Sequence, residues 1–190
     1  MAVYTKIKKY ELVSFLKLYD LGRLVSYNGI LDGIENTNFL VITEKGRFIL
    51  TIFEKRVNPK DLPFFMKLQE HLSNNGFACP IPIYGINKKI VNSLSKKNAI
   101  IISFLSGKQI KSALPNHCLQ VGQMVSNFQK INKSFNKFRK NKLSLNEWKK
   151  IFNKCLKIKN HKYLHLILPM KDELEFLNKS WPKKLPKGII

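Results

Sequence analysis

The chain has 190 residues, 44% of them hydrophobic, which is enough for a real core in one domain or two small lobes. No apolar run approaches the length of a membrane span, and the N-terminus lacks the continuous apolar segment of a signal peptide. Its three widely spaced cysteines argue against a disulfide framework, so we expect a cytoplasmic protein without membrane partners.

Positive charge is concentrated in the second half of the chain. Residues 1–85 carry 11 basic and 8 acidic side chains (net +3), whereas residues 86–190 carry 23 and 4 (net +19). Such asymmetry can mark a nucleic-acid-binding surface. However, nearly all the basic residues are Lys and come with abundant Asn and Ile, as A/T-rich codons would produce. A solvated basic surface is therefore the favoured interpretation, and nucleic-acid binding the less favoured alternative.

The first hundred residues predict a five-stranded antiparallel sheet. Leu12, Phe15, Leu16 and Tyr19 recur at helical spacing, so a helix is expected over residues 9–20. The predicted strands cover residues 23–31, 37–43, 47–54, 83–94 and 98–105. Residues 44–46 form a short hairpin loop, and a polar turn around residues 95–97 joins the last two strands.

One helix is predicted between the third and fourth strands. Asp61 is placed to cap it, and Pro63 falls in its first turn, where a missing N–H costs little. Gly76 ends this helix. Its expected buried stripe is Leu62, Phe65, Leu68 and Leu72. Glu70 and His71 are expected on its outer, solvated side.

After Gly107 the pattern changes to helices. The first has an apolar stripe of Cys118, Val121, Val125 and Phe128. The second begins at a capping box of Ser144 and Glu147 and shares one face among Trp148, Ile151, Phe152 and Cys155. Leu174, Leu177 and Trp181 indicate a third, and residues 130–142 an exposed connection. Cys118 and Cys155 are expected in the core, and His161 and His165 on the surface rather than in a zinc site.

Several segments resemble the homoserine kinases of the aminoglycoside-phosphotransferase superfamily. They are MAVYT at the start, GIENTNFLV (33–41), GRFILTIFEKRVNPKDLPFF (46–65), CPIPI (79–83), IISFLSG (101–107) and LPKGII (185–190). The resemblance implies an α+β, protein-kinase-like fold with a nucleotide-binding lobe over residues 1–105 and the first helices of a second lobe over residues 106–190. It also implies ATP and Mg2+ as cofactors and phosphorylation of the L-homoserine hydroxyl, a step of threonine biosynthesis.

The same resemblance points to residues that would contact ATP. Gly33, Asn36 and Asn38 would form the phosphate-facing turn, because glycine permits close backbone approach and the amides can donate. The adenine-binding hinge would be Ser103, Phe104 and Leu105.

The third strand departs from the pattern of related kinases, which carry a basic residue there to pair with the phosphates and with an acid on the following helix. The corresponding position holds Thr51. Lys55 or Arg56 are the alternative cations, and Glu70 is the candidate acid.

The catalytic loop of such kinases, a His-x-Asp stretch, would follow Ile190, as would the magnesium ligands. These 190 residues contain no His-x-Asp motif, so we expect no phosphoryl transfer from them alone. The sequence then fits an N-terminal fragment whose uncovered helix stripes favour association or poor solubility. A non-catalytic remnant that binds ATP or a partner is the alternative, and the oligomeric state is left open.

Overall fold

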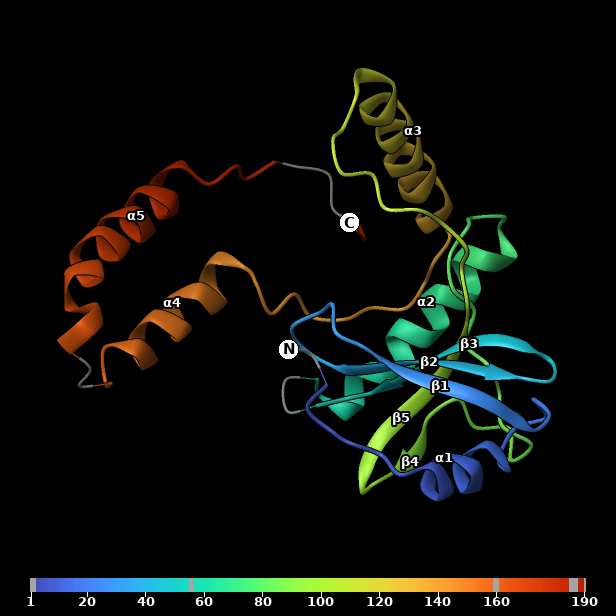
Figure 1. Ribbon diagram of the computed structural model, residues 1–190. Helices are drawn as coiled ribbons and strands as arrows, with labels where there is room; N and C mark the ends of the chain where they lie inside the picture. The colour runs from blue at the N-terminus through green and yellow to red at the C-terminus, as the bar shows by residue number, and fades with distance from the viewer. Residues whose placement is uncertain (1–2, 55–56, 159–160, 185–187, 190) are drawn as a thin grey trace. The chain divides into compact units, whose positions relative to one another are not determined.

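The computed structural model describes residues 3–54, 57–158, 161–184 and 188–189. It divides into two compact units, Met1–Lys137 with Ile189–Ile190 and Phe138–Gly188, and each unit is considered by itself. Figure 1 shows the elements of both. The division at residue 137 separates two compactly packed parts of the chain and does not test where the nucleotide-binding lobe ends. The expected lobe boundary at residue 105 therefore stays a prediction.

A five-stranded antiparallel sheet is the centre of the first unit, as predicted (Figure 1). Its spatial order is β1-β2-β3-β5-β4, so β3 lies in the middle. The strands are β1 (Leu24–Ile30), β2 (Thr37–Thr43), β3 (Gly46–Ile52), β4 (Asn92–Leu94) and β5 (Lys97–Ser103).

Two tight turns fix the strand register. Glu44 and Lys45 join β2 to β3, and Gly46 has φ +137°, a value that favours glycine. Ser95 and Lys96 join β4 to β5 with φ of +49° and +62°, as in the hairpin turns whose twist matches a twisted sheet. Both hairpins lie where the sequence predicts them.

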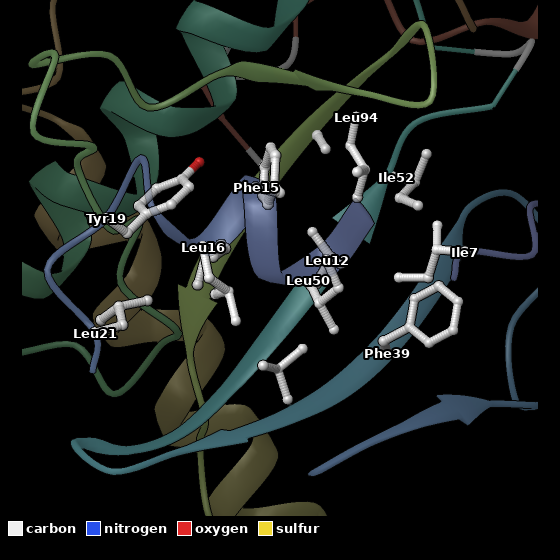
Figure 2. Close-up of a cluster of buried hydrophobic side chains, with 13 residues drawn as sticks. Ile7, Leu12, Phe15, Leu16, Tyr19, Leu21, Phe39, Leu50, Ile52 and Leu94 are labelled. Atoms are coloured by element: carbon white, nitrogen blue, oxygen red, sulfur yellow. The ribbon is translucent and has the colours of Figure 1, made fainter. Parts of the chain in front are cut away.

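Helix α1 (Lys9–Leu16) covers one face of the sheet. Leu12 is fully buried and Phe15 and Leu16 nearly so, which confirms the predicted stripe; Tyr19, in the turn after the helix, completes it. Figure 2 shows these side chains gathered with Phe39 of β2, Leu50 and Ile52 of β3 and Leu94 of β4. The strand residues of this core are Phe39, Val41, Leu50, Ile52, Leu94, Ala99 and Ile101.

The predicted strand over residues 83–94 is wrong for most of its length. Asn92–Leu94 form a strand that pairs with β5, and at the other end Ile83 N–H donates to the Ile101 carbonyl beside an isolated bridge between Pro82 and Ile102. Residues 84–91 turn instead, because Gly85 N–H donates to the Lys89 carbonyl and Lys88 has φ +61°. The Asn87 and Asn92 side chains then bond each other across the loop at 2.8 Å.

Helix α2 (Leu62–Asn74) follows a single turn of 3-10 helix, η1 (Pro59–Asp61). Asp61 is its N-cap residue as predicted, but its side chain makes no capping hydrogen bond; Asn58 instead caps η1 by accepting from Lys60 N–H at 3.0 Å. The helix buries Leu62, Met66 and Leu72, whereas Phe65 and Leu68 of the predicted stripe are only half-buried. Gly76, with φ +76°, ends it.

Helix α3 (Pro115–Asn132) presents its apolar stripe to the surface. Val121, Met124 and Val125 are each at least half exposed, and Cys118 is exposed rather than buried. Only the C-terminal end is covered, where Phe128 contacts Phe77 edge to face. The spacing identified the apolar side of this helix correctly, but no described residue of the unit covers most of it.

The second unit contains α4 (Leu145–Cys155), η2 (His161–Leu166) and α5 (Ile167–Ser180). Ser144 is the N-cap of α4 as predicted, but the capping-box bonds are absent because the Glu147 carboxylate pairs with Lys140 and Lys150 instead. Phe152 is buried, and Cys155 is exposed, contrary to expectation. Among the described residues, no helix is both long and apolar enough to cross a bilayer.

Candidate functional site

The sheet face opposite α1 carries a row of half-buried apolar side chains. Leu40 on β2 pairs with Ile49 on β3, which pairs with Ile102 on β5, so the three lie side by side across the central strands. Each is only half-buried, unlike Leu50 and Ile101 on the other face, which are fully buried. Because side chains alternate along a strand, this row forms a flat apolar surface next to polar neighbours.

A polar pair lies next to this row, towards the C-terminal end of β3. Asn38 and Thr51 are partners in the β2–β3 register, and the Thr51 hydroxyl donates to Asn38 Oδ1 at 2.8 Å. The Asn38 oxygen is thereby occupied, which leaves its Nδ2 group to donate. Thr51 supplies no cation, and its hydroxyl proton is already engaged.

The turn between β1 and β2 comes next to this pair. Gly33 has φ +122°, a conformation strained for any other residue, and its neighbours Ile34 and Leu31 are largely exposed. Asn36 Oδ1 accepts from Glu54 N–H at 3.4 Å, which leaves its Nδ2 group as a donor. The structure therefore brings Asn36, Asn38 and Thr51 together at one end of the sheet.

The predicted hinge lies beside the other end of β3. The Ser103 N–H donates to the Ile81 carbonyl, and Ser103 Oγ accepts from Ile81 N–H, both at 2.8 Å. The Arg47 guanidinium lies 4.5 Å from the Phe104 ring centroid, and Leu105 is 54% exposed. Ser103 is thus committed within the sheet, and any free backbone groups at the hinge come from the two residues after it.

The turn and the hinge are separated along one strand. Ser103 pairs with Phe48, and Asn38 pairs with Thr51, three residues further along β3. At the rise of a strand this spacing is about 10 Å. Lys55 and Arg56, the two other residues predicted to contact the nucleotide, lie outside the described residues.

Glu70 is not in solvent, contrary to expectation. Its carboxylate accepts from Lys67 Nζ at 2.9 Å and from the Tyr84 hydroxyl, and its side chain is 18% exposed. Burial raises the pKa of Glu70, but the hydrogen bonds from Tyr84 and Lys67 outweigh it and hold that pKa below its ordinary value. The hydrogen bond from Tyr84 to Glu70 therefore links the loop over residues 84–91 to α2.

His71 also faces the protein rather than solvent. Its ring contacts Phe135 at a centroid distance of 5.2 Å, and Nε2 lies 3.0 Å from the Ile131 carbonyl. This contact joins α2 to the end of α3. The predicted exposed connection therefore begins later than residue 130, because Ile131 and Asn132 are covered.

Sequence reasoning missed a cluster of four side chains at the same end of the sheet as Asn36. The Glu54 carboxylate accepts from the hydroxyls of Thr5 (2.6 Å) and Thr37 (2.8 Å) and forms an ion pair with Lys97. Burial raises the pKa of Glu54, but hydrogen bonds from Lys97, Thr5 and Thr37 more than offset this, so its pKa is lowered. No periodicity connects residues so distant in sequence, and we find no sequence signal that identifies this cluster.

The described residues offer no metal site. Nowhere in the described ranges do three His, Cys, Asp or Glu side chains lie together as ligands. His165, one of the two histidines considered for zinc, is exposed, as is Cys155. A hollow of about 550 Å³ in the second unit is lined mainly by apolar side chains of α4 and α5, including Trp148, Phe152 and Met170.

Known proteins resemble the chain over its whole length. Homoserine kinases from Rhizobium meliloti and Paramagnetospirillum magneticum are each 40% identical, over 190 and 194 aligned residues, and that of Brucella ovis is 39% identical over 190. All of this chain is covered in each case, and the chain spans 58% of the length of these relatives.

Solved structures share the fold. A spectinomycin phosphotransferase crystallised with ADP and spectinomycin superposes with a TM-score of 0.64 at 13% identity, covering 96% of this chain and 60% of that one. An aminoglycoside phosphotransferase from Alicyclobacillus acidocaldarius gives 0.55 at 14% identity, covering 93% and 55%. These likenesses confirm the predicted kinase-like fold. The family model described as "Phosphotransferase enzyme family" matches residues 26–190, and the chain therefore belongs to that family.

Proposed function

We propose that the chain is the nucleotide-binding part of an ATP-dependent kinase that phosphorylates the L-homoserine hydroxyl. The observation that carries the proposal is the 40% identity to homoserine kinases across all 190 residues. The apolar row and the polar end of the sheet support it, because a nucleotide needs both kinds of surface. We further propose that residues 1–105 form the nucleotide lobe and residues 106–190 the start of the second lobe, in the cytoplasm.

The purine would lie on the apolar row. Leu40, Ile49 and Ile102 present half-buried apolar side chains, the kind that predominate in ligand sites. The Ser103 N–H already donates a hydrogen bond to the Ile81 carbonyl, so we assign the backbone groups of Phe104 and Leu105 to the adenine edge.

The phosphates would lie at the polar end. Gly33 lets the backbone of the turn approach closely, and the Nδ2 groups of Asn36 and Asn38 donate to phosphate oxygens. Asp32 and Glu35 add negative charge to this turn, so cations must come from elsewhere. Lys55 or Arg56, which follow Glu54 directly in sequence, remain the proposed source.

Bound ATP would supply the phosphoryl group, and this part of the chain would bind and orient it. Positioning and charge stabilisation are the main contributions of a protein to such a transfer. The described residues do not provide a ligand set for Mg2+, so no step is assigned to a metal held by them. The groups that deprotonate the hydroxyl are likewise not assigned to these residues.

Two measurements test the proposal. Isothermal titration of MgATP and of adenosine into the 190-residue chain should show binding of both. Asn38→Asp keeps the acceptor for Thr51 but turns a donor into a negative charge, so the Kd for MgATP should rise at least tenfold, about 1.4 kcal/mol, while that for adenosine stays constant. Asn127→Asp, on the exposed part of α3, is the control for the same change in net charge. Equal effects of the two variants would contradict the phosphate assignment.

The substrate is tested by extending the chain. Fusing residues 1–190 to the remaining part of the Rhizobium meliloti homoserine kinase should give an enzyme that releases ADP in the presence of L-homoserine. The 190 residues alone should not. If the fusion folds and binds ATP but is active only on another hydroxyl compound, the homoserine assignment fails and the kinase assignment stands.

A further inference from the structure

The N-terminal segment, residues 3–7, packs tightly against the sheet. Ile7 is buried in the core under α1, and Val3 packs at its edge. The fit against β1 is close, since a Cβ on Gly29 would come within 2.9 Å of Val3 Cγ2. Between these two residues, Tyr4 and Thr5 direct their backbone N–H groups to Thr37, at the exit of the β1–β2 turn.

Tyr4 and Thr5 hold this turn at two points. The Tyr4 hydroxyl donates to the Ile34 carbonyl at 2.7 Å, inside the turn. The backbone N–H groups of Tyr4 and Thr5 both donate to Thr37 Oγ1, at 3.0 and 3.1 Å. Thr37, fully buried, is the first residue of β2, so the turn is fixed both in its middle and at its exit.

Glu54 ties these contacts to the sheet. The hydroxyl groups of Thr37 and Thr5 each donate a hydrogen bond to Glu54 Oε1. Lys97 Nζ donates to Thr5 Oγ1 at 2.7 Å and pairs with the second carboxylate oxygen. We call these four side chains the Glu54 cluster; it joins the N-terminal segment, β2, the end of β3 and β5.

The hydrogen-bonding capacity of this cluster is well used. The Thr37 hydroxyl accepts twice and donates once, which exhausts it. The Glu54 side chain is only 11% exposed, so the loss of one partner would leave a nearly buried charge or hydroxyl without compensation. Glu54 also holds the turn with its backbone, through N–H to Asn36 Oδ1. A change at one member should therefore loosen the turn as a whole.

We propose that the Glu54 cluster is a positioning device for nucleotide phosphates: it and the N-terminal segment hold the β1–β2 turn in the conformation that binds them. The inference rests on the proposed nucleotide site and adds residues that would not themselves touch ATP. For a ligand that binds only when the turn is ordered, the apparent Kd equals the intrinsic Kd divided by the fraction of molecules in which the turn is ordered. Phosphate binding would depend on this fraction, and adenosine binding would not.

The experiment compares two buried threonines at opposite ends of β2. Thr37→Val removes a hydroxyl from the cluster, and Thr43→Val removes one beside the β2–β3 turn, where Thr43 is 4% exposed. Thr5→Val and Thr5→Ser form a second pair, since serine restores the hydroxyl. For each 190-residue variant, Kd values for MgATP and adenosine are measured by titration, and amide hydrogen exchange of residues 33–37 is measured without ligand.

The proposal predicts faster exchange of residues 33–37 in Thr37→Val and Thr5→Val, with the MgATP Kd raised about tenfold and the adenosine Kd changed less than twofold. Thr43→Val and Thr5→Ser should behave as the unmodified chain. Unchanged exchange of the turn in Thr37→Val would overturn the proposal even if ATP binds. If MgATP binding and adenosine binding weaken equally, the cluster has only a structural role, and the proposal is overturned too. If the unmodified chain binds no nucleotide while the turn still loosens, the proposed function fails, and the phosphate role fails with it.

Discussion

Neighbouring residues on β3 should separate stability from nucleotide binding. Leu50 is fully buried against α1, whereas Ile49, the residue before it, is half-buried on the opposite face between Leu40 and Ile102. Leu50→Ala should therefore cost about 2–5 kcal/mol of unfolding free energy, since it leaves a cavity in the core. For a chain of this size, such a loss lowers Tm by roughly 10 °C. Binding per folded molecule should not change.

Ile49→Ala should give the opposite pattern. It shortens a side chain that is only half-buried, so the stability cost should be smaller, about 1 kcal/mol. The same side chain would contact the purine, and losing about 1 kcal/mol of that contact raises the adenosine Kd roughly fivefold. Thermal unfolding measures the stability of each variant, and titration of the folded variants with adenosine at 10 °C measures binding. The reasoning is refuted if Leu50→Ala weakens adenosine binding as much as Ile49→Ala does.

Three further predictions concern the turn, acid and association. Gly33→Ala, at φ +122°, should strain the turn by about 1–2 kcal/mol, and in a titration it should weaken the binding of MgATP but not that of adenosine. The lowered pKa of Glu54 gives stability that is present above its ordinary value of 4.5 and is lost as the pH falls through the lowered value; Glu54→Gln should flatten this acid loss in denaturant titrations. Replacing exposed Val121 and Met124 by serine should shift the chain from oligomers towards monomer in light scattering, and unchanged association would point to another surface.

The regular parts of the fold were predictable because their signals are local. Alternation and turn residues marked β2 and β3 to within a residue at the start of each, and helical spacing marked the buried side of α1. The prediction of a strand over residues 83–94 was wrong because it followed the apolar residues there. The segment turns instead, through the backbone hydrogen bond of Gly85 and the side-chain hydrogen bond between Asn87 and Asn92.

The site was predictable only in part, for a similar reason. The family resemblance indicated Asn38 and Thr51, and the strand register brings them into contact. The Glu54 cluster was missed because Thr5 and Lys97 are 92 positions apart, and only the folded sheet makes them neighbours. For Cys118, the helical spacing gave the apolar side correctly, but spacing does not say what covers that side.

The most direct test of the central claim is to map where ATP binds. In a backbone-amide NMR titration of the 190-residue chain with MgATP, the largest shifts should appear in the β1–β2 turn and the start of β2 (residues 33–38), at Ile49 and Thr51 on β3, and at Phe104 and Leu105. Residues of α1 and of the lysine-rich second unit should change little. Shifts concentrated in residues 138–188 would mean that ATP binds only as an anion to a basic surface, and this would contradict the account.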